Sequence, residues 1–129
     1  MSSKTEIVKP RRLYLCGPVS GMKEGNAPEF AKWQEEFAAL DVETVNPTAI
    51  GLTLDTPWND AMKVCIVEML ECDGVAMLPN WIASSRGCRL EVHVAIAVGI
   101  EVAYAMDWVA HCKGKPVSRA SRLVQRRAQ

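Results

Sequence analysis

Short apolar runs and longer amphipathic segments alternate along this chain. The apolar runs cover residues 13–16, 42–45, 74–78 and 100–103. The first is followed by Gly17-Pro18 and the second by Asn46-Pro47, which are residues that commonly end regular structure. Because the runs are short and mostly apolar, they predict strands that are buried on both faces.

The longer segments repeat their apolar residues at the spacing of a helix. In the first, which Pro28 opens, these residues are Phe30, Trp33, Phe37 and Leu40. In the second, they are Met62, Cys65, Ile66 and Met69. We expect Thr56 to cap this second helix, which then runs to about residue 72. A third helix is expected over residues 87–98, ended by Gly99, and a short fourth over residues 106–112.

Strands that alternate with helices indicate a parallel sheet, because parallel neighbours need crossover connections. A chain of 129 residues suits one hydrophobic core. The predicted fold class is therefore α/β, a single Rossmann-like (flavodoxin-like) domain with a parallel sheet flanked by helices. We place it at residues 12–112, between a flexible leader at 1–11 and a basic C-terminal tail at 113–129.

The charges narrow the classes of function. The formal net charge of +0 at pH 7 gives no sign of a partner that is a specific nucleic acid or a membrane surface. After Asp107 the chain has no acid but six cations: Lys113, Lys115, Arg119, Arg122, Arg126 and Arg127. This tail could touch phosphates, although a solvated chain end explains it more simply.

The cysteines indicate the compartment. There are five, an odd number, and none has the spacing of a zinc site. The sequence shows no signal peptide and no transmembrane run. We therefore expect reduced thiols, cytoplasmic localisation, and neither a metal nor another cofactor.

Ligands of open parallel sheets bind outside the carboxyl ends of the strands. The loops expected there are residues 17–22, 46–47 and 79–87. Gly17 and Gly21 could let the backbone approach a ligand, or could serve only a tight turn. Ser85-Arg86-Gly87 begins the third helix, where free N–H groups favour an anion. Capping by Ser85 would explain the serine but not Arg86.

Glu91 is the leading catalytic candidate. It comes soon after the expected end of the third strand, in a helix whose other residues are mostly apolar. An acid in a first helical turn can simply stabilise the helix dipole. A partly buried carboxylate beside a ligand is instead a candidate nucleophile or general base.

Aromatic residues and one further acid complete the candidates. Trp58 and Trp81 could each stack on a nucleobase or anchor the core or an interface. Tyr14 could bring its hydroxyl near the first loop. Asp73 fits turn chemistry well and a pocket role less well. Trp108 and the basic tail are possible interface material.

Together these residues resemble a known family. The pattern is Tyr14-Leu15-Cys16-Gly17-Pro18, Asn46-Pro47, Cys72-Asp73, and Ser85-Arg86-Gly87 followed by Leu90-Glu91 and Ala95. It is similar to the nucleoside 2-deoxyribosyltransferase superfamily, most of all to its small phage and bacterial members. The resemblance covers about residues 13–103.

The resemblance implies chemistry at an N-glycosidic bond. In that family a glutamate matching Glu91 attacks the anomeric carbon of a deoxyribosyl group and displaces the nucleobase. The substrate is then a deoxynucleoside or its 5′-monophosphate, and the product forms by transfer or by hydrolysis. The family also implies a homo-oligomer, because a neighbouring subunit helps to close the pocket.

Two departures from the family pattern matter. The transferases carry an aspartate where this chain has Cys65, and a thiol does not replace a carboxylate as a proton relay. The monophosphate hydrolases carry a serine and an arginine in the first loop, where this chain has Pro18 and Ser20. A phosphate would then need Arg86 or Arg89.

The predictions for the site follow from all of this. Glu91 is the predicted catalytic residue, and no metal-binding residue is predicted. The predicted substrate-binding residues are Tyr14, Gly17, Pro18, Ser20, Gly21, Asn46, Asp73, Trp81, Ser85, Arg86 and Gly87. The alternative is a non-catalytic nucleotide-binding or sensing protein that retains the pocket. A related electrophile, such as NAD, is a third possibility.

Overall fold

The computed structural model describes residues 9–53, 55–81 and 85–115. The greater parts of the predicted leader and basic tail, residues 1–8 and 116–129, lie outside the described residues. The elements in chain order are β1 (Arg12–Cys16), η2 (Lys23–Asn26), α1 (Ala27–Ala38), β2 (Glu43–Val45), η3 (Pro47–Ala49), α2 (Trp58–Leu70), β3 (Gly74–Met77), α3 (Arg86–Ala97), β4 (Glu101–Tyr104) and α4 (Ala105–Cys112). The η elements are short 3₁₀ helices.

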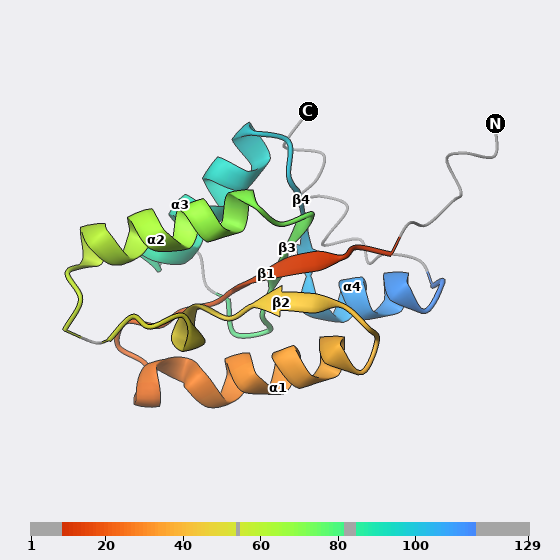
Figure 1. The fold of residues 1–129 in the computed structure, drawn as a ribbon, viewed down its shortest axis with the longest axis horizontal. Coiled ribbons are helices and arrows are strands. Elements are labelled where there is room, and N and C mark those ends of the chain that lie inside the picture. The colour runs from red at the N-terminus through yellow and green to blue at the C-terminus, as the bar shows by residue number, and fades with distance from the viewer. Residues whose placement is uncertain (1–8, 54, 82–84, 116–129) are drawn as a thin grey trace.

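The strands form one four-stranded sheet in the order β2-β1-β3-β4, and every neighbouring pair is parallel. Helices α2 and α3 cover one face of the sheet, and α1 and α4 cover the other (Figure 1). The α/β prediction, with a parallel sheet flanked by helices, is therefore confirmed. Within the described residues, no helix combines the length and the apolar character needed to cross a bilayer.

Strand β1 contributes side chains to both layers of the core, because successive residues of a strand point to opposite faces. Leu13 and Leu15 pack in the cluster that includes residues of α1 and α4. Tyr14 and Cys16 pack in the cluster that includes residues of α2 and α3. All four side chains have 0% exposure. The alternation fixes which side chains of β1 can reach α3.

Trp108 shows how tightly the core layer between the sheet and helices α1 and α4 is packed. Its indole N–H donates to the carbonyl oxygen of Val75 at 2.8 Å, and its side chain is buried. A Cβ at Gly74 would lie only 2.5 Å from the Trp108 ring, so this position of β3 requires glycine. The expectation that Trp108 is interface material is wrong, because the residue belongs to the core.

The start of α2 also differs from expectation. The helix begins at Trp58, and Pro57, not Thr56, occupies the N-cap position. The hydroxyl of Thr56 instead accepts a hydrogen bond from the backbone N–H of Thr53 at 3.0 Å. This bond ties the loop that precedes α2 to itself, and that loop forms part of the cavity described next.

Candidate active site

A cavity of about 540 Å³ opens at the carboxyl ends of the strands. This volume lies in the range of roughly 300–1,000 Å³ that is usual for small-molecule sites. The wall consists of residues that follow β1 and β2, up to Ala27 at the start of α1, and of residues from α2 and α3. Strands β2 and β3 lie on opposite sides of β1, so this is the switch point where such sheets bind ligands.

Glu91 lines the cavity although its side chain is almost completely buried. The hydroxyl of Tyr14 donates to Oε2 of Glu91 at 2.6 Å, and the thiol of Cys16 donates to Oε1 at 3.3 Å. Glu91 is the sixth residue of α3 and therefore lies beyond its first turn. Since the helix dipole acts mainly on the first turn, it does not explain this glutamate.

Burial sets the ionisation of Glu91. The loss of hydration raises the pKa of its carboxyl from the ordinary 4.5 to about 7, although the hydrogen bonds from Tyr14 and Cys16 act in the opposite direction. Protonated and ionised forms are therefore comparably populated at neutral pH. The pKa of the Tyr14 hydroxyl is raised well above 10, first by burial and then by the neighbouring carboxylate. Tyr14 accordingly remains a donor.

Two thiols, those of Cys65 and Cys88, lie in the cavity wall beside Glu91. Cys65 also belongs to the core cluster against α2, so the structure gives it both a packing role and a wall position. Burial raises the pKa of the Cys65 thiol, and a hydrogen bond with Tyr14 lowers it. The thiol is therefore protonated near neutral pH and carries no charge.

A pair of amides joins the segment after β1 to the loop after β3. The side-chain amide of Asn80 donates to Asn26 at 2.9 Å, and Asn26 donates back at 3.4 Å. This pair holds a turn in which Glu24, Gly25 and Asn26 all have positive φ values. A positive φ costs conformational free energy in residues other than glycine, and it persists where surrounding contacts support it. The turn brings Glu24 into the cavity wall.

The N-terminus of α3 lies at the cavity, and Ser85 and Gly87 line it. The Ser85 hydroxyl accepts from the backbone N–H of Cys88 at 3.3 Å and so caps the helix. Arg86 does not line this cavity. Its guanidinium lies 3.8 Å from the centre of the Trp58 ring, which also lines the cavity, and belongs to an adjoining, more open groove that it shares with Arg89.

The structure thus brings five of the predicted site residues together in the wall: Gly17, Ser20, Ser85, Gly87 and Glu91. Tyr14 reaches the site through its bond to Glu91. Pro18, Gly21, Asn46 and Trp81 are not in the cavity wall. Asn46 instead caps η3 by accepting from the backbone N–H of Thr48, and Trp81 packs against the core.

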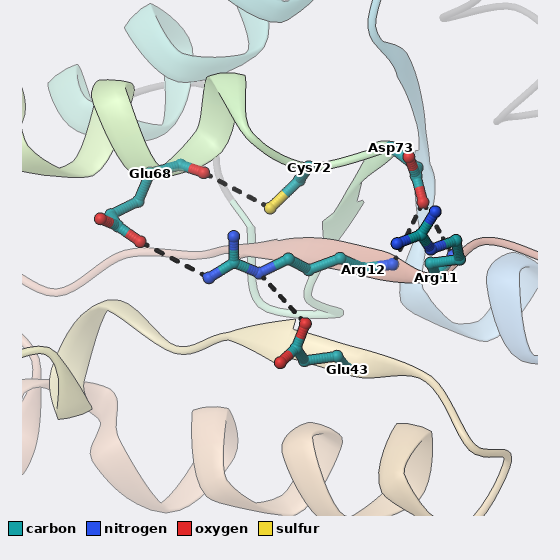
Figure 2. Close-up of polar contacts among 6 residues, drawn as sticks. All are labelled: Arg11, Arg12, Glu43, Glu68, Cys72 and Asp73. Atoms are coloured by element: carbon teal, nitrogen blue, oxygen red, sulfur yellow. Dashed lines mark hydrogen bonds and ion pairs between the residues drawn. The ribbon is translucent and has the colours of Figure 1, made fainter.

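Asp73 lies at the opposite end of the sheet, where β3 begins. Its Oδ2 accepts from the backbone N–H groups of Arg11 and Arg12 at 2.8 and 3.2 Å (Figure 2). The side chain of Arg12 in turn forms ion pairs with Glu43 and Glu68 at 3.5 and 3.7 Å. This network fixes the start of β1 against its neighbours, and it contributes no group to the cavity.

A model of the family described as "Domain of unknown function (DUF4406)" matches residues 11–104. The chain belongs to the DUF4406 family. A search of curated proteins finds no match. The matched range contains β1 to β4 and every described residue of the cavity wall. The sheet and the cavity therefore lie within the segment that the family model covers.

Several wall residues of this DUF4406 domain were not among the predicted site residues, although Val19 and Pro47 lie in loops that were expected at the ligand edge. They are Val19, Glu24, Gly25, Ala27, Pro47, Thr48, Leu52, Thr53, Thr56, Ala61, Met62 and Cys88. The rest of the loop after β2 could have been found, because a parallel sheet places the residues that follow Asn46-Pro47 at the ligand edge. Glu24 could not, because its left-handed backbone leaves no signal in the sequence.

Proposed function

We propose that this domain cleaves or transfers the N-glycosidic bond of a deoxynucleoside or a deoxynucleoside 5′-monophosphate, with Glu91 as the nucleophile. The observation that carries the proposal is a buried carboxylate in the wall of a cavity of about 540 Å³, held by one donor on each oxygen. The family resemblance of the sequence supplies the bond type.

In the proposed reaction, the buried carboxylate of Glu91 stabilises positive charge that develops on the sugar. As the bond to the nucleobase lengthens, the sugar acquires oxocarbenium character, and the anomeric carbon becomes positive. A carboxylate in a site that excludes water interacts with this charge more strongly than one in solvent does. The glycosidic electron pair leaves with the base, which takes a proton from water, and Glu91 becomes a glycosyl ester. Water or a second base then attacks the anomeric carbon and releases the carboxylate.

The described wall favours the uncharged nucleoside over the monophosphate. It contains two carboxyl groups, those of Glu24 and Glu91, and no lysine or arginine among the described residues. Arg86 is stacked on Trp58 in the neighbouring groove. The wall carries hydroxyl groups suited to a sugar: Ser20, Thr48, Thr53, Thr56 and Ser85. The feature that suits a phosphate is the N-terminus of α3.

The test is release of free base from a panel of deoxynucleosides and their 5′-monophosphates, followed by chromatography. We expect release by the wild-type protein and none above background by Glu91→Gln. Nucleosides should be turned over faster than their monophosphates. Equal activity in the variant would refute the role of Glu91, and a strict requirement for the phosphate would refute the preference for the nucleoside.

The alternative is a nucleotide-binding or sensing protein without turnover. It is favoured by Cys65, a protonated thiol at the position where the resembling transferases carry a carboxylate. This alternative predicts that nucleosides raise the melting temperature by mass action while no free base is produced. Multiple turnovers in the same samples would exclude it.

We also infer that the domain forms a homo-oligomer. Three large apolar side chains of α2, those of Val64, Val67 and Leu70, are exposed, as is Val98 after α3. Helices α2 and α3 pack side by side on the same face of the sheet (Figure 1). Exposed apolar side chains on helices that cover one face of the sheet suit a symmetric contact between copies of one chain.

A further inference from the structure

Glu91 is held by two donors from a single strand. Tyr14 and Cys16 are two residues apart in β1, so their side chains lie on the same face of the sheet. The Tyr14 hydroxyl bonds to Oε2 and the Cys16 thiol to Oε1. Neither donor lines the cavity, whereas Glu91 does. Residues of β1 therefore hydrogen-bond the carboxylate from the side away from the cavity, and each carboxylate oxygen has its own donor.

The two hydrogen bonds are unequal. The O–H donor lies 2.6 Å from Oε2, a short distance typical of a strong bond to a charged acceptor. A thiol is a weak donor, and the sulfur lies 3.3 Å from Oε1. The carbonyl oxygen of Cys88 is a second acceptor for this thiol, but at 3.9 Å it is farther away. Oε1 therefore keeps more of the negative charge than Oε2.

The thiol of Cys16 is in the protonated form that donation requires. Its contact with Cys88, its complete burial and the neighbouring Glu91 all raise its pKa well above the ordinary 9. The other titratable groups that face Glu91 are Tyr14 from β1, Cys65 from α2 and Cys88 from α3 itself. Among the described residues, no lysine, arginine or histidine forms an ion pair with Glu91.

We propose that Cys16 is a positioning residue that orients Glu91 through a weak hydrogen bond, and that Oε1 is the oxygen that bonds to the sugar. This assignment rests on the proposed glycosidic function. The role of Cys16 in holding the carboxylate rests on the geometry alone and can be tested without a substrate.

The bond changes explain why the weak donor belongs on the attacking oxygen. A lone pair of Oε1 forms the bond to the anomeric carbon while the glycosidic pair leaves with the base. Oε2 becomes the carbonyl oxygen of the ester and still accepts from Tyr14, so only the weak thiol bond is lost. When water attacks the anomeric carbon, the pair returns to Oε1 and the water gives a proton to solvent. Attack through Oε2 would instead disrupt the shorter and stronger bond.

The test replaces Cys16 by a stronger donor and by no donor. Cys16→Ser places a hydroxyl near Oε1, and Cys16→Ala removes the donor. Cys72→Ala is the matched control, because Cys72 is also buried but donates to the carbonyl oxygen of Glu68, away from the site. The ionisation of Glu91 is followed by NMR of protein with ¹³C-labelled glutamate carboxyls, and its signal is assigned by its absence in Glu91→Gln.

The expected shifts have opposite signs. At a fixed pH near 7, Cys16→Ala should lower the ratio of ionised to protonated Glu91 about threefold, and Cys16→Ser should raise it about threefold. Cys72→Ala should leave it unchanged. A merely structural role of Cys16 would move both Cys16 variants in the same direction. That result, or no change in either, would overturn the proposal.

A kinetic arm tests the choice of oxygen. Well above pH 7, where Glu91 is ionised in every variant, Cys16→Ser should slow the formation of free base several-fold more than Cys16→Ala does. Slowing of equal size in both variants would contradict the assignment of Oε1. If the wild-type protein releases no base from any substrate, the proposed function and the oxygen assignment fail together, while the NMR arm still decides the role of Cys16.

Discussion

The burial of Glu91 makes a quantitative prediction about folding. A carboxyl whose pKa is raised on folding binds its proton more tightly in the native state than in the unfolded chain. Its contribution to stability is therefore fully present below the unfolded pKa and is lost as the pH rises through the folded pKa. For Glu91 this window extends from 4.5 to about 7. Replacement by glutamine removes the titrating group and leaves the shape of the side chain.

The expected magnitude follows from the shift. Each unit of pKa corresponds to about 1.4 kcal/mol, so a change from 4.5 to about 7 gives about 3 kcal/mol. Because the carboxyl is almost completely buried, solvent screening does not reduce this figure much. Between pH 4 and pH 8, Glu91→Gln should therefore gain about 3 kcal/mol of unfolding free energy relative to the wild-type protein.

The assay is urea unfolding of both proteins at a series of pH values, followed by far-UV circular dichroism. Only the difference between the two proteins is interpreted, since all other titrating groups contribute equally to both. The conservative variant Glu36→Gln serves as control, because Glu36 is exposed and lies outside the cavity. A difference between wild type and Glu91→Gln that does not vary with pH would refute the conclusion that this carboxyl has a raised pKa.

Three further predictions follow from the site and the surface. If the ionised form of Glu91 attacks, kcat/KM for base release should rise with pH and level off above a midpoint near 7; a profile that falls over this range would exclude a carboxylate nucleophile. Asp73→Ala should lower the unfolding free energy by about 1 kcal/mol in urea titrations, because two backbone N–H groups lose their acceptor. The same variant should bind nucleosides as the wild type does in calorimetric titration, and weakened binding with unchanged stability would show that Asp73 serves the cavity. Replacing Val64 and Val67 together by aspartate should convert the proposed oligomer to a monomer in light scattering, while the same change at the exposed Lys32 and Glu36 of α1 should not; a monomeric wild-type protein would refute the interface.

The fold could be predicted because its signals are local. Apolar runs that end in Gly17-Pro18 and Asn46-Pro47 marked the strands, and the spacing of Phe30, Trp33 and Phe37 marked α1. The four predicted strands and four main helices all occur, with boundaries shifted by one or two residues, which is where such predictions are least certain. The start of α2 is shifted by one residue as well, with Pro57 rather than Thr56 at the N-cap.

The site could be predicted only in part. Glu91 and the loops after β1 and β3 followed from the topology of parallel sheets, because the carboxyl ends of the strands meet at one edge. The hydrogen bonds of Tyr14 and Cys16 to Glu91 depend on how α3 packs on β1. They join residues that are 77 and 75 positions apart in the sequence. The place of Asp73 depends on backbone N–H groups 61 and 62 residues away. Contacts of this range leave no periodicity in the chain.

The most direct test of the account is to look for the covalent intermediate. The protein is mixed with a deoxynucleoside whose sugar carries fluorine at the 2′ position, which slows both steps by destabilising the oxocarbenium-like transition state. Intact-mass measurement and peptide mapping then locate any adduct. We predict one fluorodeoxyribosyl group per chain on Glu91, and none on Glu91→Gln. Free base released without an adduct on Glu91, or an adduct on another residue such as Glu24, would contradict Glu91 as the nucleophile.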